Sequence, residues 1–298
     1  MRLIDRKRAA GLTTAVALTL AALVMPGETI LAGPSETSDA ERIVAIGGSV
    51  TEIVFALGEQ DRLIARDSTS IFPAEANALP DVGYIRRLSP EGVLSVNPEL
   101  LLMLEGSGPQ EAVDVLKKSG VAIADVPEDF SADGIVDKVR AVGQALGVEK
   151  KAAELAEKLE ADLDSAQADA AGKTEGVRVL FVLSTRGGRI MASGRDTAAD
   201  GILKLAGAEN AVAEFPGYKQ LSDEAILSAA PDVILMMDRT GNHASNADDL
   251  FSHPALAQTP AGKNNRLIKM GGQYLLGFGP RTAEAIRDLA EQLAEIRS

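Results

Sequence analysis

The feature that most constrains this chain is a stretch that occurs twice, at 83–104 and at 217–237. In each copy a Gly-Tyr step and a basic residue are followed by Leu-Ser, a glutamate, a short helical segment, a proline and a buried apolar strand. A serine with an acid just after it suits a helix start, because both satisfy or complement the free backbone N–H groups there. The repeat predicts two similar lobes that face each other.

Strand and helix patterns alternate along most of the chain. Apolar strands are predicted at 42–46, 63–66, 100–104, 121–125, 177–183, 189–192, 233–237 and 266–270. Helices are predicted at 50–57, 110–119, 135–146 and 197–205, with a last helix after 281. This alternation is typical of α/β proteins, and it predicts two Rossmann-like lobes with mainly parallel sheets.

A helix without proline or glycine is expected between the two repeats, at 149–171. Leu155, Leu159 and Leu163 recur there at the spacing of one helix face. An ordinary surface helix would show the same pattern, but the position between the repeats favours a rigid bridge. The expected division is a signal peptide at 1–32, an N-terminal lobe at 33–147, a bridging helix at 148–172 and a C-terminal lobe at 173–298.

The first 32 residues have the pattern of a secretory signal. A basic segment precedes an apolar run at 9–24, which is too short to span a bilayer comfortably, and Ile30-Leu31-Ala32 offers a cleavage site. The alternative is a retained membrane anchor. The chain contains no cysteine, which excludes a lipid-modified cysteine, disulfides and thiolate metal sites. A periplasmic protein, soluble after cleavage, is therefore expected.

The charge of the chain is strongly acidic. The full chain carries −13 and residues 1–32 carry +2, which leaves −15 for the remainder. An acidic surface of this kind argues against nucleic acid as a partner.

The sequence offers little for catalysis. It has no Gly-x-Ser-x-Gly elbow, no phosphate loop and no Rossmann glycine fingerprint. The only histidines, His243 and His253, lie in one polar segment and are expected to be solvated, which disfavours a zinc site. A protein that is not an enzyme is predicted. The alternative of another class is an exported α/β enzyme with its site at the lobe interface.

Tyrosine is scarce, with only Tyr84, Tyr218 and Tyr274. Two of the three occupy equivalent places in the repeat, where loops at the carboxyl ends of parallel strands gather to form sites. A tyrosine could simply fasten its loop to the helix behind it. The doubled placement beside Arg86, Arg87 and Lys219 favours a ligand cleft between the lobes.

The mature chain resembles the periplasmic haem-binding proteins of bacterial haem ABC importers. These belong to a helix-bridged, two-lobed class that also carries siderophores and cobalamin. The segments that carry the resemblance are 47–52, 79–89, 194–200, 256–262 and 274–281. The two-lobe frame is shared across the class, whereas the tyrosine segment and the 274–281 loop are more specific to haem. The resemblance implies capture of haem b (hemin), and a ferric siderophore or cobalamin is the alternative ligand.

In that family the tyrosine that matches Tyr84 is the axial ligand of the haem iron. Tyrosinate ligation of haem is known, and a nearby guanidinium favours the phenolate. Arg86 is expected beside this phenol or on a propionate, with Arg87 as the substitute.

Some family members add a histidine from the opposing lobe, but the corresponding segment here, 184–191, contains none. The open possibilities are five-coordinate iron, a water, Met191 or Tyr218. Arg186 and Tyr274 complete the expected haem contacts.

The resemblance also implies partners. Glu91 and Glu224 occupy matching helix starts, and the corresponding acids in this class dock onto arginines of the permease dimer. The alternative role is that of helix-dipole acids, and both roles can hold together. A monomer is expected, with an outer-membrane haem receptor acting upstream.

Overall fold

The computed structural model describes residues 39–238 and 250–297, which belong to one compact unit. The signal peptide expected at 1–32 and nearly all of the polar loop expected at 238–249 lie outside the described residues. Within the described ranges, no helix is both long and apolar enough to cross a membrane.

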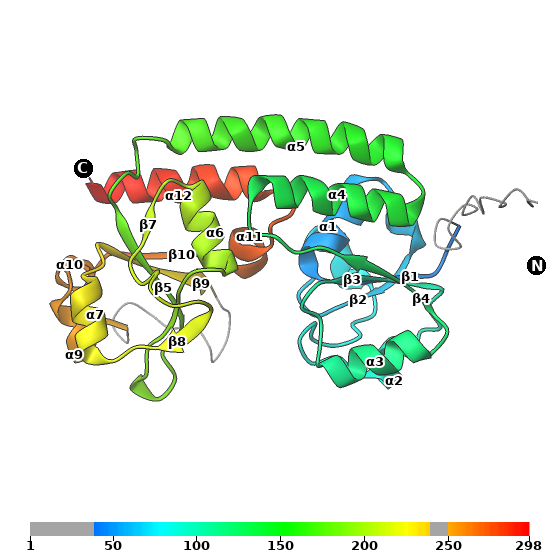
Figure 1. The fold of residues 1–298 in the computed structure, drawn as a ribbon, viewed down its shortest axis with the longest axis horizontal. Helices are drawn as coiled ribbons and strands as arrows, with labels where there is room; N and C mark the ends of the chain where they lie inside the picture. The colour runs from blue at the N-terminus through cyan, green and yellow to red at the C-terminus, as the bar shows by residue number, and fades with distance from the viewer. Residues whose placement is uncertain (1–38, 239–249, 298) are drawn as a thin grey trace, which may run out of the picture. The chain divides into compact units, whose positions relative to one another are not determined.

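The first sheet is fully parallel, as predicted, with the order β2-β1-β3-β4. Its strands are β1 (Ile43–Ile46), β2 (Leu63–Arg66), β3 (Leu100–Leu104) and β4 (Ala122–Val126). Its helices are α1 (Gly48–Ala56), α2 (Pro90–Leu94), α3 (Gln110–Lys118) and α4 (Ala132–Leu146), with 3-10 turns η1 (Gln60–Arg62) and η2 (Ala74–Ala78). In Figure 1, α1 and α4 lie on one side of this sheet and α2 and α3 on the other.

The second sheet is mixed, with the order β10-β9-β5-β6-β8 and with β7 beside β5. Its strands are β5 (Arg178–Ser184), β6 (Met191–Ser193), β7 (Glu209–Asn210), β8 (Tyr218–Gln220), β9 (Val233–Asp238) and β10 (Leu267–Gly271). Strand β6 runs antiparallel to both β5 and β8. The sequence did not predict β8, because its three residues are exposed and show no apolar alternation.

The helices of the second lobe enclose its sheet from two sides. They are α6 (Ala198–Leu205), α7 (Asp223–Ala229), α9 (Pro254–Gln258), α10 (Pro260–Lys263), α11 (Gly272–Leu276) and α12 (Thr282–Arg297), with the 3-10 turn η3 (Arg186–Gly188). Side chains alternate along β5, as they must in a strand. Val179 and Phe181 join the cluster that contains α6 and α12, whereas Leu180 and Val182 join the cluster that contains α7, α9 and α10.

The segment expected to form a tight loop at 274–281 begins instead as helical turn α11, and a loop follows it into α12. The apolar residues Tyr274, Leu275 and Leu276 occupy that turn, and Leu275 is fully buried. Burial of the Leu275 side chain favours the helical turn. The glycines of this segment had instead indicated a loop.

Helix α5 (Glu149–Ala170) is the bridge that the sequence predicted. It packs along both α4 and α12 (Figure 1). Its buried face includes Ala156, Leu159, Leu163 and Ala166, at the three- and four-residue spacing of one helix face. One apolar cluster runs from β1 through α5 to α12, so the bridge is part of the core. The domain boundaries given above remain a proposal.

Candidate functional site

The first copy of the repeat presents Tyr84 on a turn that three buried apolar side chains anchor. Val82, Ile85 and Leu88 pack into the core, whereas the Tyr84 side chain is 48% exposed. The Arg87 N–H donates to the Tyr84 carbonyl at 2.7 Å and closes the turn. The phenol is therefore directed outward from an anchored loop.

Backbone hydrogen bonds from both sides hold this turn. The Gly108 N–H donates to the Ile85 carbonyl at 2.9 Å, and the Leu88 N–H donates to the Gly108 carbonyl at 2.8 Å. The Gly83 carbonyl accepts from the Ser68 N–H at 2.9 Å. Gly83 has φ +108°, a conformation that favours glycine, which explains the first residue of the Gly-Tyr step.

The second copy places Tyr218 at the start of β8, opposite Ser193 of β6. The preceding Gly217 again has a positive φ of +71°, and it exchanges backbone hydrogen bonds with the segment 194–195. The Tyr218 side chain is 44% exposed. Both tyrosines of the repeat are thus exposed beside a glycine turn, although the first lies in a loop and the second in a strand.

Electrostatic interactions connect the two copies. Burial raises the pKa of the Tyr218 phenol, and a hydrogen bond with Ser193 and the charge of Arg86 oppose that rise. The Tyr84 phenol also acts on this pKa. Tyr84 and Arg86 come from the first lobe and Tyr218 from the second, so the structure brings these three predicted residues together.

The two arginines of the first copy differ in their surroundings. The Arg86 guanidinium lies over the loop after β3, where a Cβ on Gly106 would be 4.0 Å from its Nη1. Burial raises the pKa of Glu128, and the charges of Lys138 and Arg86 oppose this rise. Arg86 therefore lies within electrostatic range of both Glu128 and Tyr218, whereas the described role of Arg87 is the backbone bond that closes the turn.

Three other residues that were expected to contact haem lie on three different elements. The Tyr274 hydroxyl donates to Oδ2 of Asp288 on α12 at 2.7 Å, and burial together with Asp288 raises its pKa. Met191 is half-buried in β6 opposite Gln220, and Arg186 is exposed in η3. Their roles in ligand binding stay predictions.

Lys219, one of the basic residues beside the repeated tyrosines, lies on another surface of its lobe. Its ammonium group lies 5.7 Å from the centroid of the Phe215 ring. Successive side chains of a strand point to opposite faces, which directs Lys219 away from the face of Tyr218.

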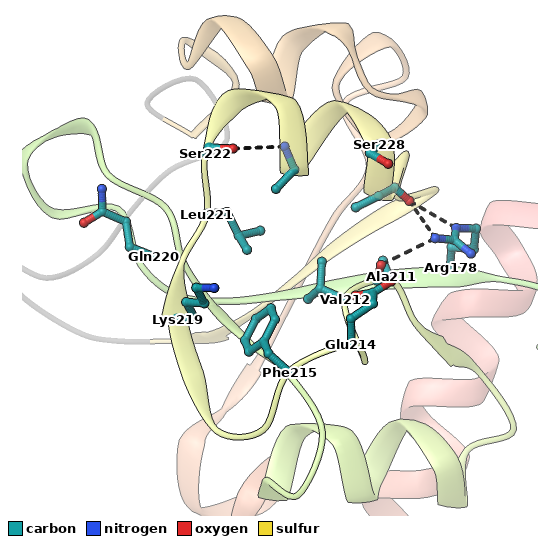
Figure 2. Close-up of a pocket in the computed structure, with 12 residues that line it drawn as sticks. Arg178, Ala211, Val212, Glu214, Phe215, Lys219, Gln220, Leu221, Ser222 and Ser228 are labelled. Atoms are coloured by element: carbon teal, nitrogen blue, oxygen red, sulfur yellow. Dashed lines mark hydrogen bonds between the residues drawn. The ribbon is translucent and has the colours of Figure 1, made fainter.

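Lys219 and Phe215 line a pocket of about 500 Å³ whose lining residues all fall within 178–229 (Figure 2). At one end Arg178 donates to the backbone carbonyls of Ala211 and Ala229, so its guanidinium is engaged in holding the wall. The pocket is confined to the second lobe and is separate from Tyr84 and Arg86.

The helix starts that carry Glu91 and Glu224 have the predicted caps. The Ser89 hydroxyl accepts from the Gly92 N–H and the Ser222 hydroxyl accepts from the Ala225 N–H, each at 3.3 Å. Both glutamates are exposed. Hydrogen bonding to its own backbone N–H and to Ser222 lowers the pKa of Glu224, which keeps it ionised.

His253 is mostly buried, contrary to the expected solvated position. Its side chain is at the start of α9, with Nε2 3.9 Å from Asp223, and its Nδ1 is buried without a hydrogen-bond partner. His243 lies outside the described residues. Among residues 39–238 and 250–297, no group of three or more His, Cys, Asp or Glu side chains could hold a metal ion.

Comparison with known proteins decides the family. Residues 43–274 match the family model described as periplasmic binding protein. The chain belongs to the periplasmic binding protein family. Members of that family and the structural neighbours below are solute-binding proteins, which agrees with the scarcity of catalytic motifs.

Solved structures of this periplasmic binding protein fold are similar over most of the chain. The periplasmic heme-binding protein RhuT from Roseiflexus sp. RS-1 is 38% identical, with a TM-score of 0.83, covering 87% of this chain and all of that one. BhuT, a periplasmic heme-binding protein solved with two hemes, is 35% identical, with a TM-score of 0.81, covering 86% of this chain and 99% of that one.

Two relatives in sequence are less similar, and one of them is named for a different ligand. A vitamin B12-binding protein of Vibrio parahaemolyticus is 25% identical over 86% of this chain and 90% of its own length. An ABC transporter substrate-binding lipoprotein, YvrC of Bacillus subtilis, itself uncharacterised, is 29% identical over 85% of this chain and 80% of its own length.

Proposed function

We propose that this periplasmic binding protein captures haem between its lobes and delivers it to an ABC permease. The observation that carries the proposal is that Tyr84 and Arg86 of one lobe lie within electrostatic range of Tyr218 of the other. The likeness to heme-binding proteins that are 35% and 38% identical supports the same ligand class.

Tyr84 is the residue proposed to bind the ferric iron. Its phenol is exposed on an anchored turn, so it can reach a ligand without rearrangement of the backbone. Ferric iron is a hard acid that favours an anionic oxygen ligand, and tyrosinate ligation of haem iron is known. Arg86 is placed to pair with a propionate, which a guanidinium binds through two parallel hydrogen bonds.

Haem b is the ligand proposed, and the protein is expected to transport it without chemical change. It would act in the periplasm as a monomer after removal of residues 1–32, receiving haem that an outer-membrane receptor has admitted. Glu91 and Glu224, exposed at capped helix starts in the two lobes, are proposed to contact the permease dimer.

An absorption titration of the mature protein with hemin tests the ligand and its axial residue together. Tyr84→Phe removes only the phenol oxygen, so the tyrosinate charge-transfer band should disappear and the affinity should fall. Tyr218→Phe is the matched control, and it should retain the band. Unchanged spectra in Tyr84→Phe would remove Tyr84 from the iron site.

Cobalamin is the second candidate, because a vitamin B12-binding protein is 25% identical over most of the chain. The same titration with cobalamin and with a ferric siderophore distinguishes the candidates. Binding of cobalamin in preference to hemin would reject the haem proposal and keep the transport role. Turnover of a substrate without any dependence on these ligands would revive the alternative of an exported enzyme.

A further inference from the structure

Two segments that lie apart in the sequence, 47–52 and 273–281, meet between the two sheets. Glu52 on α1 has a side chain that is 6% exposed, and it faces Arg281, which precedes α12. The Arg281 Nε and Nη2 atoms donate to the two carboxylate oxygens at 3.1 and 3.0 Å, and its backbone N–H donates to Oε1 at 3.1 Å. The guanidinium also lies 3.4 Å from the centroid of the Phe72 ring. Three hydrogen bonds thus link one lobe to the other at a single carboxylate.

Gln273 makes a second link across the same junction. Its Nε2 donates to the Gly48 carbonyl and its Oε1 accepts from the Ile71 N–H, both at 2.9 Å. A Cβ on Gly48 would lie 3.0 Å from Gln273 Cγ and 3.0 Å from the Thr69 carbonyl oxygen, so a larger residue would crowd the junction. One side chain of the second lobe therefore binds backbone groups from the start of α1 and from a loop of the first lobe.

A fully buried lysine makes the third link. Lys138 on α4 donates to the Phe278 carbonyl of the second lobe at 3.0 Å and to Glu128 Oε1 at 2.5 Å. The Phe278 ring packs edge-on against Phe130 of the first lobe, with 5.2 Å between centroids. A buried charge is tolerated only when it is paired, so Glu128 allows Lys138 to reach across the junction.

We propose that these three links form an interlobe clamp that fixes the spacing between Tyr84 and Tyr218. Glu52, Arg281, Gln273 and Lys138 are then positioning residues for the ligand site, which they set without touching the ligand. The links are directional, because each hydrogen bond requires a defined geometry, whereas apolar packing is non-directional. A clamp of this kind keeps the lobes at the binding distance before the ligand arrives. Affinity falls when only a small fraction of the molecules has the conformation that binds, and the clamp keeps that fraction high.

The test compares lobe spacing with ligand affinity in one set of proteins. Because the chain has no cysteine, Val115→Cys and Leu227→Cys place single spin labels on exposed positions of the two lobes. In this background, Glu52→Leu with Arg281→Met removes both members of the buried pair, so that no unpaired charge remains. Pulsed electron paramagnetic resonance should show a broadened distance distribution. If about a tenth of the molecules keep the binding spacing, the hemin Kd should rise about tenfold.

Arg287→Met is the matched control. Arg287 is on α12, which begins directly after Arg281, and it pairs with Asp162 and Asp169 of α5 and not with the first lobe. Its distance distribution and hemin affinity should equal those of the parent. Arg281→Lys keeps the buried charge paired while losing the two-pronged contact, and it should broaden the distribution to an intermediate extent if the double variant does not fold.

The two possible failures are distinguishable. The ligand part of the inference rests on the proposed function, whereas the spacing measurement needs no ligand. An unbroadened distribution in the double variant and in Arg281→Lys overturns the clamp, and a broadened distribution with unchanged hemin affinity overturns its positioning role. If the parent protein does not bind hemin, the haem proposal is refuted. The measured distance distributions then still decide whether the clamp exists.

Discussion

At the residue scale, the site depends on which of two adjacent arginines faces the ligand. Arg86 acts on the pKa values of Glu128 and Tyr218, and it lies over the loop that contains Gly106. Arg87 contributes a backbone bond that closes the Tyr84 turn, and substitution of its side chain leaves that bond intact. The sequence could not separate the two, because neighbours in a turn diverge according to backbone dihedral angles that residue types alone do not determine.

Arg86→Ala should weaken hemin binding by about 1.5–3 kcal/mol, the typical value of a hydrogen bond to a charged group. Arg87→Ala should be nearly silent, because the described bond of Arg87 is made by its backbone N–H, which the substitution keeps. Isothermal titration with hemin measures both. Equal, negligible losses would mean that the propionates are held by other residues.

Tyr218 should contribute through its ring. Aromatic packing against the haem face or edge is worth about 0.5–1.5 kcal/mol beyond the area buried, so Tyr218→Ala should weaken binding modestly while the tyrosinate band remains. Tyr218→Phe keeps the ring and should bind as the parent does. A large loss in Tyr218→Phe, measured in the same titration, would instead place the phenol on the iron or on a water bound to it.

At the scale of elements, the repeat was largely readable from the sequence. Serine caps, short helices and buried strands recur in both lobes as predicted, because capping and apolar runs are local signals. Strand β8 was missed because pairing with β6 creates it. The burial of His253 and the Glu52–Arg281 contact could not be predicted either, since each depends on segments that are distant in sequence.

The Asp200 carboxylate at the start of helix α6 should make the stability of the protein depend on pH. Burial disfavours the charged form of Asp200, but hydrogen bonds from Lys204, Asn210 and the Asp196 N–H outweigh it and lower the pKa below 3.8. The stabilisation is therefore complete above the unfolded pKa and is lost as the pH falls through the folded pKa. Asp200→Asn should cost about 1.5–3 kcal/mol at pH 7 and progressively less in acid.

Urea unfolding at several pH values measures this effect. Asp137→Asn serves as the control, because Asp137 forms an exposed pair with Arg140, and such pairs contribute little. A loss in Asp200→Asn that stays constant down to the most acidic pH would show that the carboxylate charge is not the cause.

At the scale of the whole molecule, the acids at matching helix starts concern transport. Glu91 and Glu224 are exposed and belong one to each lobe, so a permease dimer could contact both at once. Glu91→Lys or Glu224→Lys should lower haem uptake in reconstituted vesicles, because like charges would face each other across the contact. Hemin affinity should not change. Full transport by both variants would show that these glutamates act only as helix-dipole acids.

The apolar cluster that joins β1 to α12 through α5 also governs how the chain reaches its native state. Helices α5 and α12 are neighbours in space but are separated in the chain by the whole second sheet. Contacts between such distant segments slow folding, because a long loop must close before burial compensates for the lost entropy. The core cluster that contains β1 is complete only after α12 docks on α5. Refolding should therefore be slow and concerted across both lobes, and a newly made chain should stay unfolded longer than one whose lobes fold independently.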